Sequence, residues 1–359
     1  MRRELATLSG LARAGFTSLS DVRVALDELD ALRVVGDVEI VSEFGVVADP
    51  DAALDGLLAL ARTHPDAVRE ACASAASRRA LLAVLGASRG LADFLHRHPD
   101  ALEAVRVPLD RLPDADELRS SLLASVGADA DGGVARVGDE SDWASLRTCY
   151  RRWLTAIAAF DLTSSSPVEI VGRVSETLAD LAGAALDASL AVARRMVSSD
   201  QPGPGVFPPS EVAATRLAII GMGKAGASEL NYVSDVDVIF VAESGDEAVS
   251  SGRAIDISTR LAMLSMRGIA DPGIEPPLWE VDANLRPEGK AGALVRTLES
   301  HLAYYDRWAK SWEFQALLKA RSFAGDRELG DRYVAAVGPR VWASSSREGF
   351  VESVQRMRE

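Results

Sequence analysis

Two aspartates at the start of an apolar segment are the residues of this sequence best placed to do chemistry. Asp235 and Asp237 alternate with valines in SDVDVIFVAE, residues 234–243. Because successive side chains of a strand point to opposite faces, both carboxylates should leave the same face. Burying charge in such a segment is costly unless a partner or a metal compensates it. The pair therefore indicates a carboxylate site for a divalent cation.

A third acidic residue can complete this site. PLWEVDANLRP, residues 277–287, reads as another strand, and its alternation places Glu280, Asp282 and Asn284 on one face. We expect Asp282 to join the first two aspartates. A cluster of three carboxylates suits two Mg²⁺ or Mn²⁺ ions about 3.5 to 4 Å apart, which clamp the attacking and leaving oxygens of an in-line phosphoryl displacement. The alternative is that these acids form a solvated strand end.

A GxGxxG loop, residues 221–226, lies at the end of the apolar run TRLAIIGMG and before the two aspartates. Dinucleotide folds contain the same pattern, with an acidic residue about 20 positions later, and Glu243 has that spacing. Only the seven residues 227–233 precede the next predicted strand, whereas a parallel crossover needs roughly a dozen. A dinucleotide fold is therefore excluded. A P-loop is excluded as well, because Lys224 is followed by Ala225 rather than by a magnesium-binding Ser or Thr.

Composition narrows the function further. At 359 residues, 48% hydrophobic and 26% charged, the chain is long enough for two or three domains. A net charge of -14 argues against non-specific binding of nucleic acid. With four histidines and no HExxH pattern, carboxylates must hold any metal. No apolar run reaches the roughly 18 residues of a membrane span, and Cys72 and Cys149 lack a CxxC pattern. We expect a soluble cytoplasmic protein, with both cysteines as core residues.

The elements that carry these residues fall into four regions. Apolar positions at helical spacing predict an all-helical region over residues 1–200, in which the His-Pro pairs at 64–65 and 98–99 end one helix and begin the next. The proline- and glycine-rich residues 201–210 predict a linker. Residues 211–325 predict a mixed α/β core, and residues 326–359 predict the start of a further helical segment.

Within the core, residues 246–268 predict a long amphipathic helix, and further helices are expected from Thr297 to Arg321. The chain is expected to end inside a helix at EGFVESVQRMRE, residues 348–359, as a fragment of a longer protein would.

The stretch Gly-x-Gly-Lys-x-Gly-x-x-Glu-Leu-Asn-x-x-Ser-Asp-x-Asp, residues 221–237, resembles the nucleotidyltransferase motif of the DNA polymerase β-like superfamily. More narrowly, the chain resembles the family of bifunctional glutamine synthetase adenylyltransferase/adenylyl-removing enzymes. Three further stretches agree: LGASRGLADFLHRHP (85–99), VDANLRPEGKAGALV (281–295) and WEFQALLKAR (312–321). The resemblance implies an α+β fold, with a mixed-sheet nucleotidyltransferase core preceded by a large all-helical N-terminal region and followed by helices.

That family fuses two related halves, one that removes AMP from a tyrosine of glutamine synthetase and one that attaches it. This chain has one DxD core, an initiating Met, a helical extension before the core, and Glu229-Leu230-Asn231 where the second half more often has Glu-Leu-Gly. These features resemble the AMP-removing half, although a Gly-Gly-x-Arg segment that the family carries further downstream is absent. The implied reaction is phosphorolysis, in which phosphate attacks adenylyl-tyrosine and ADP is released. The alternatives are the AMP-attaching half, which uses ATP, or a non-catalytic module that binds a nucleotide or the nitrogen-signalling protein PII.

The resemblance also implies roles for individual residues. Asp235, Asp237 and Asp282 would bind two Mg²⁺ or Mn²⁺ ions, and Gly221, Gly223 and Lys224 would bind phosphate oxygens. Ser234 would bind a phosphate oxygen or cap the turn before the strand. Arg286, Lys319 and Arg321 are candidate anchors for the attacking phosphate, or else members of surface ion pairs. The implied partners are adenylylated glutamine synthetase, PII, phosphate and ADP or ATP, with neither nucleic acid nor membrane among them.

Overall fold

The structure is a computed structural model of the 359-residue chain. It describes residues 7–35, 40–129, 133–201, 203–344 and 355. The helix in which the chain was expected to end, residues 348–359, lies outside the described residues apart from position 355.

The chain forms two compact units. One comprises Met1–Leu112 and Arg151–Val174, and the other comprises Pro113–Tyr150 and Ser175–Glu359. The boundaries between the units do not fall at residues 201–210, where a linker was expected. Helical residues before position 200 pack with the sheet and belong to its unit. Asp187, for example, accepts a hydrogen bond of 2.7 Å from the backbone N–H of Gly325.

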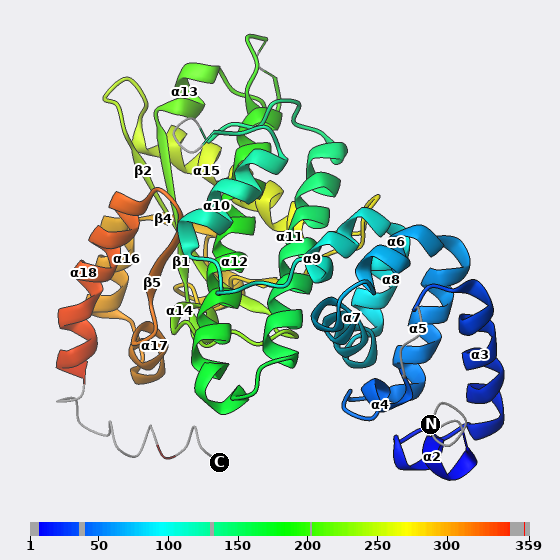
Figure 1. Cartoon of the computed structure of the whole chain (residues 1–359). Helices are drawn as coiled ribbons and strands as arrows, with labels where there is room; N and C mark the ends of the chain where they lie inside the picture. Colours follow the sequence, from blue (N-terminus) through cyan, green and yellow to red (C-terminus); the bar gives the residue numbers. More distant parts are fainter. Residues whose placement is uncertain (1–6, 36–39, 130–132, 202, 345–354, 356–359) are drawn as a thin grey trace. The chain divides into compact units, whose positions relative to one another are not determined.

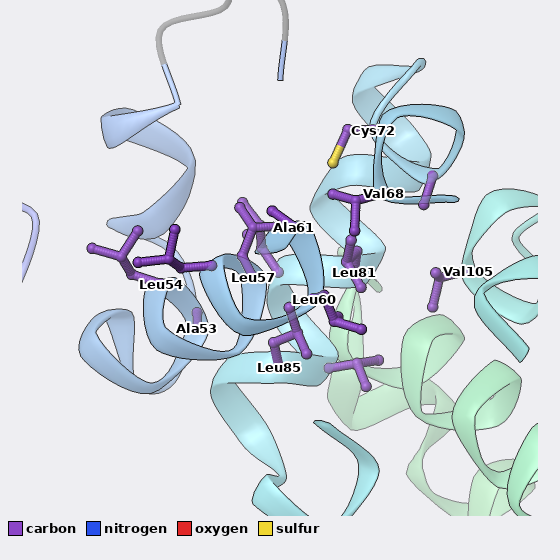
Figure 2. Close-up of a cluster of buried hydrophobic side chains, with 14 of the residues drawn as sticks. Ala53, Leu54, Leu57, Leu60, Ala61, Val68, Cys72, Leu81, Leu85 and Val105 are labelled. Atoms are coloured by element: carbon purple, nitrogen blue, oxygen red, sulfur yellow. The ribbon is translucent and has the colours of Figure 1, made fainter. Parts of the chain in front are cut away.

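The first unit is helical and is built around an apolar core. Its elements are α2 (Leu8–Arg13), α3 (Leu19–Leu32), α4 (Val41–Phe44), α5 (Pro50–Thr63), α6 (Pro65–Ala71), α7 (Ala75–Ala87), α8 (Arg89–Arg97), the 3-10 helix η1 (Pro99–Leu102) and α9 (Glu103–Arg106). Both His-Pro pairs separate consecutive helices, as predicted. Figure 2 shows leucines of α5 and α7 meeting in this core. Cys72 is buried there, and burial raises the pKa of its thiol to about 12, so it is a core residue rather than a nucleophile.

Two long helices contribute residues to both units, α11 (Glu140–Leu162) and α12 (Pro167–Val197). The second unit adds the helices α10 (Ala115–Ser125), α13 (Pro209–Ala213), α14 (Gly223–Gly226), α15 (Ser251–Ala270), η2 (Gly289–Ala291), α16 (Leu298–Arg307), α17 (Ser311–Leu317) and α18 (Arg327–Ser344). Its strands are β1 (Thr215–Gly221), β2 (Val236–Ser244), β3 (Val281–Asp282), β4 (Val295–Thr297) and β5 (Arg321–Gly325). In the described part of the chain, no helix combines the length and apolarity needed to cross a membrane.

The five strands form a mixed sheet in the order β3-β2-β1-β5, with β4 also paired to β2. Strand β1 runs antiparallel to β2 and β5, whereas β2 runs parallel to β3 and β4. The α+β fold with a mixed sheet is therefore confirmed. The antiparallel pairing of β1 and β2 also agrees with the absence of a crossover helix that the short connection predicted.

Two predicted elements differ from the structure. The third strand, expected over residues 277–287, pairs only at Val281 and Asp282, because the chain then turns: the Asp282 Oδ1 atom accepts the backbone N–H of Asn284 at 2.7 Å. At the other end of the core, the expected helices stop at Leu317, and Arg321 begins strand β5, which pairs with β1.

Alternate residues of the sheet build its core. Ala218 and Ile220 of β1 and Ile239 and Val241 of β2 form one apolar cluster with residues of α16, α17 and α18. Figure 1 shows α16 and α18 side by side along the sheet, and α15 packs against β1, β2 and β4. Asp237 lies two and four positions before Ile239 and Val241 in β2. Because side chains alternate between the two faces of a strand, the Asp237 side chain lies on the same face of the sheet as that cluster.

Candidate functional site

The three predicted acidic residues meet at one end of the sheet. Asp235 directly precedes β2, Asp237 is the second residue of β2, and Asp282 ends β3. The parallel pairing of β2 and β3 sets Asp237 beside Asp282. Each of the three carboxylates offers an oxygen atom within 4.8 Å of the other two. Local alternation and strand pairing together therefore bring the three side chains into one cluster.

Like charges crowd this cluster. Burial raises the pKa of the Asp237 carboxyl, and the neighbouring charges of Asp235 and Asp282 raise it further, while Lys224 opposes them. A divalent cation would relieve this repulsion. Three carboxylates form an all-oxygen ligand set of the kind that Mg²⁺ and Mn²⁺ prefer. The residues present therefore fit such an ion.

The glycine loop closes against the acidic cluster. The backbone N–H of Met222 donates to the carbonyl of Asp237 at 2.9 Å. Gly223, the first residue of α14, has a φ of +52°, and a Cβ atom there would lie 2.2 Å from Oδ2 of Asp237. Any other residue at this position would be strained and would displace the carboxylate. Glycine thus lets the start of α14 lie directly against the acids.

A short hydrogen-bond chain connects α14 to the same acids. The Lys224 ammonium donates to the side chains of Asn231 and Ser234, each at 3.2 Å. The Ser234 hydroxyl in turn donates to Asp235 at 3.3 Å. The Asn231 amide also donates to the carbonyl of Val233 at 2.8 Å, so Asn231 fixes both the loop and the lysine. The Glu-Leu-Asn triplet singled out Asn231 as a family feature but did not predict this role.

Arg286 borders the cluster but is engaged by its own loop. Its guanidinium donates to the carbonyls of Ala283 at 2.8 Å, Gly292 at 3.2 Å and Lys290 at 3.4 Å. Burial lowers the pKa of Arg286, and the nearby charge of Asp282 opposes that shift. Arg286 therefore shapes the turn that follows Asp282 and lies within electrostatic range of that carboxylate.

The remaining predicted residues are engaged elsewhere. Lys319 forms an ion pair of 2.9 Å with Glu229, and Arg321 donates to Asp180 at 3.1 Å and to the carbonyl of Ala225 at 3.0 Å. Of the two alternatives for these cations, the structure shows the ion pairs for both, and a role as phosphate anchors stays a prediction. Arg321 lies in strand β5, which was not predicted. Gly221 lies at the end of β1, where a Cβ atom would come within 2.9 Å of the Phe323 ring.

The family model described as glutamate-ammonia ligase adenylyltransferase matches residues 78–336. A bifunctional glutamine synthetase adenylyltransferase/adenylyl-removing enzyme of Leifsonia xyli subsp. xyli is 59% identical, with 100% of this chain and 35% of the relative covered. Proteins of the same name from Streptomyces avermitilis (44% identical, 99% of this chain and 33% of the relative) and Mycobacterium avium (46%, 86% and 29%) also match. The chain spans about a third of the length of these relatives.

Proposed function

Because the chain belongs to the glutamate-ammonia ligase adenylyltransferase family, we propose that it removes AMP from an adenylylated tyrosine of glutamine synthetase by phosphorolysis. The observation that carries this proposal is the cluster of Asp235, Asp237 and Asp282, held against a glycine loop. The preference for removal over attachment rests on the Glu229-Leu230-Asn231 triplet and on the helical region that precedes the core.

In this reaction an oxygen of inorganic phosphate forms a bond to the phosphorus of adenylyl-tyrosine. The bond between that phosphorus and the tyrosine oxygen breaks, ADP is released, and the phenolate takes up a proton from water. A free phenol has a pKa of about 10, so its anion is a fair leaving group and a strong general acid is not required. Positioning and charge therefore supply most of the catalysis.

The carboxylates of Asp235, Asp237 and Asp282 would hold one or two Mg²⁺ or Mn²⁺ ions. Such ions, when bound, neutralise charge on the phosphoryl oxygens and stabilise the leaving phenolate. The backbone at Gly223 and the ammonium of Lys224 lie beside the acids and would orient the nucleotide phosphates. Ser234 would hold Lys224 in place through their hydrogen bond of 3.2 Å.

Of the three cations expected to anchor the attacking phosphate, Arg286 retains the best support. Its guanidinium interacts electrostatically with Asp282, whereas Lys319 forms an ion pair with Glu229 and Arg321 forms one with Asp180. We therefore assign the nucleophile to the side of the cluster nearest Asp282 and Arg286.

Turnover of a defined substrate tests the proposal. The chain is incubated with adenylylated glutamine synthetase, phosphate and Mg²⁺, while ADP release and recovered synthetase activity are followed. Both signals should rise together, and both should be lost with EDTA or in the Asp237→Asn variant. ADP release that persists in Asp237→Asn would show that the acidic cluster is not the active centre.

A second candidate function is attachment of AMP from ATP to glutamine synthetase, since the relatives' name contains both activities. A third is a regulatory module that binds a nucleotide or PII without turnover. Transfer of AMP from ATP to unmodified synthetase would identify the second. Binding of PII together with no Mg²⁺-dependent binding of ADP or ATP would identify a module that binds only protein.

A further inference from the structure

Arg321 lies behind the glycine loop, where three elements of the second unit meet. Its guanidinium donates to Asp180 of α12 at 3.1 Å and to the carbonyl of Ala225 in α14 at 3.0 Å. The guanidinium carbon also stacks over the ring of Phe323, 5.2 Å from its centre. Arg321 thus joins α12, β5 and α14 through a single side chain.

Arg321 contacts the glycine loop and also lines a cavity of about 290 Å³ together with Asp180 and Phe323. In the sheet, Arg321 is the register partner of Gly221, the first glycine of the loop. A Cβ atom on Gly221 would lie 2.9 Å from the Phe323 ring, and one on Gly183 of α12 would lie 2.9 Å from the Phe323 carbonyl. Through Phe323, strand β5 therefore packs closely against both α12 and the glycine loop.

Helix α14 needs an external anchor. It has only four residues, Gly223–Gly226, so its own hydrogen bonds cannot fix its direction. The bond from Arg321 to Ala225 supplies a charged donor from outside the helix. Asp180 holds that donor in place: burial raises the pKa of the Asp180 carboxyl, and the contact with Arg321 opposes the shift and favours the charged form.

We propose that Arg321 and Asp180 form a clamp that positions α14, so that Gly223 and Lys224 stay against the acidic cluster. In this assignment Arg321 is a positioning residue and does not touch the attacking phosphate. The inference rests on the proposed function for its kinetic consequences, whereas its effect on α14 can be measured without turnover.

Four variants test the clamp: Arg321→Met, Arg321→Lys, Asp180→Asn and the double variant Asp180→Asn/Arg321→Met. Loss of a charge-assisted hydrogen bond should lower kcat by about tenfold in Arg321→Met and by less in Asp180→Asn. The KM for phosphate should stay within about twofold of the parent value. The double variant should be no worse than Arg321→Met, because both changes remove the same interaction. Arg321→Lys keeps the charge beside Asp180 and should recover part of the loss.

Hydrogen exchange supplies a readout that does not depend on catalysis. The backbone amides of Gly226 and Ala227, which close α14, should exchange faster in Arg321→Met and in Asp180→Asn. The Asp306→Asn/Arg340→Met pair is a matched control, because that ion pair joins α16 to α18. Its variants should leave both the kinetics and these amides unchanged.

Two results would overturn the clamp. A raised KM for phosphate in Arg321→Met, with parental kcat and a silent Asp180→Asn, would make Arg321 a phosphate ligand. Unchanged exchange at Gly226 and Ala227 in both single variants would remove any role in positioning. Failure of the proposed function looks different, since the parent chain would then show no phosphorolysis while exchange in α14 still responded to the variants. Should Arg321→Met fail to fold, Arg321→Lys and Asp180→Asn carry the same comparison.

Discussion

The sheet-bearing unit holds two groups of carboxylates whose environments differ. In the first group, one carboxylate oxygen from each of Asp235, Asp237 and Asp282 lies within 4.8 Å of the other two. The ammonium of Lys224 opposes their charge. On the other side of the glycine loop, each carboxylate has its own guanidinium. Asp180 accepts from Arg321 at 3.1 Å, and Asp187 accepts from Arg119 at 2.8 Å.

Both environments raise the pKa of a buried carboxyl, but for different reasons. For Asp180 and Asp187 the cause is burial, and their arginines oppose it. For Asp237, burial is reinforced by the charges of Asp235 and Asp282. The paired acids are therefore neutralised within the chain, whereas the acidic cluster keeps an excess of negative charge that an external cation can compensate. Acids of the first kind should serve stability or the positioning of α14, and acids of the second kind should serve chemistry.

The largest expected effect is on turnover in the acidic cluster. Asp237→Asn should lower kcat for phosphorolysis by at least about a thousandfold, or about 4 kcal/mol of transition-state stabilisation, because one charged ligand of the metal site is lost. Steady-state assays at saturating phosphate measure this loss. Asp187→Asn, assayed below its unfolding temperature, should remain within about threefold of the parent. Equal losses in the two variants would remove the distinction between the two groups of acids.

Lys224→Met should have the next largest effect. Removing the ammonium beside the acids should lower kcat/KM by about thirtyfold, or about 2 kcal/mol, because a charged contact to the nucleotide phosphates is lost. The Kd of ADP in Mg²⁺, measured by calorimetry, should rise in parallel. Lys310→Met is the matched control, since Lys310 is exposed at the start of α17. Parental affinity for ADP in Lys224→Met would show that the lysine serves the loop alone.

Asp237→Asn and Asp187→Asn should rank in the reverse order for stability, with the larger loss in Asp187→Asn. Asp187 is buried, with one oxygen bonded to the N–H of Gly325 and the other to Arg119. Burial raises the pKa of Asp187, but Asp187→Asn removes the carboxylate to which Arg119 donates. We expect the loss of that charged bond to outweigh the relief of burying a charge, so the free energy of unfolding should fall by about 2 kcal/mol. Urea unfolding of the metal-free protein checks this value. A loss in Asp237→Asn as large as that in Asp187→Asn would assign a structural role to the acidic cluster too.

The smallest expected effect is a pH dependence that belongs to the acidic cluster. A carboxyl whose pKa is raised in the folded protein binds its proton more tightly there than in the unfolded chain. Its ionisation therefore lowers the free energy of unfolding as pH rises through the raised pKa of Asp237. Without metal at pH 7, Asp237→Asn should be more stable than the parent by at most about 1 kcal/mol. The gain should shrink as pH falls toward about 4, near the unfolded pKa of aspartate.

Unfolding curves of both proteins across this pH range give the measurement, with Mg²⁺ added in a parallel series. Metal should stabilise the parent more than the variant. A difference between parent and variant that does not change with pH would show that the three carboxylates do not repel one another.

Local patterns predicted the acidic cluster well. Alternation over residues 234–243 placed Asp235 and Asp237 on one face, and a second apolar segment supplied Asp282. The glycine loop was identified from its GxGxxG pattern, and the connection of only seven residues after it correctly excluded a crossover helix.

The interactions that depend on distant pairing could not be predicted. RSFAG at residues 321–325 has little apolar alternation, and it becomes strand β5 because it pairs with β1. Without that strand, the side chain of Arg321 could not be placed beside Asp180, which lies 141 residues earlier in the chain. The early end of β3 has a local cause instead: the backbone N–H of Asn284 donates to the side chain of Asp282, which had been assigned to metal binding alone.

The most direct test of phosphorolysis follows the phosphorus atom of the nucleophile. Adenylylated glutamine synthetase is incubated with the chain, Mg²⁺ and isotopically labelled phosphate, and the products are separated. The proposed reaction predicts label in the β-position of ADP, in an amount equal to the tyrosine set free. AMP as the sole product, or AMP transfer from ATP to unmodified synthetase without labelled ADP, would contradict it.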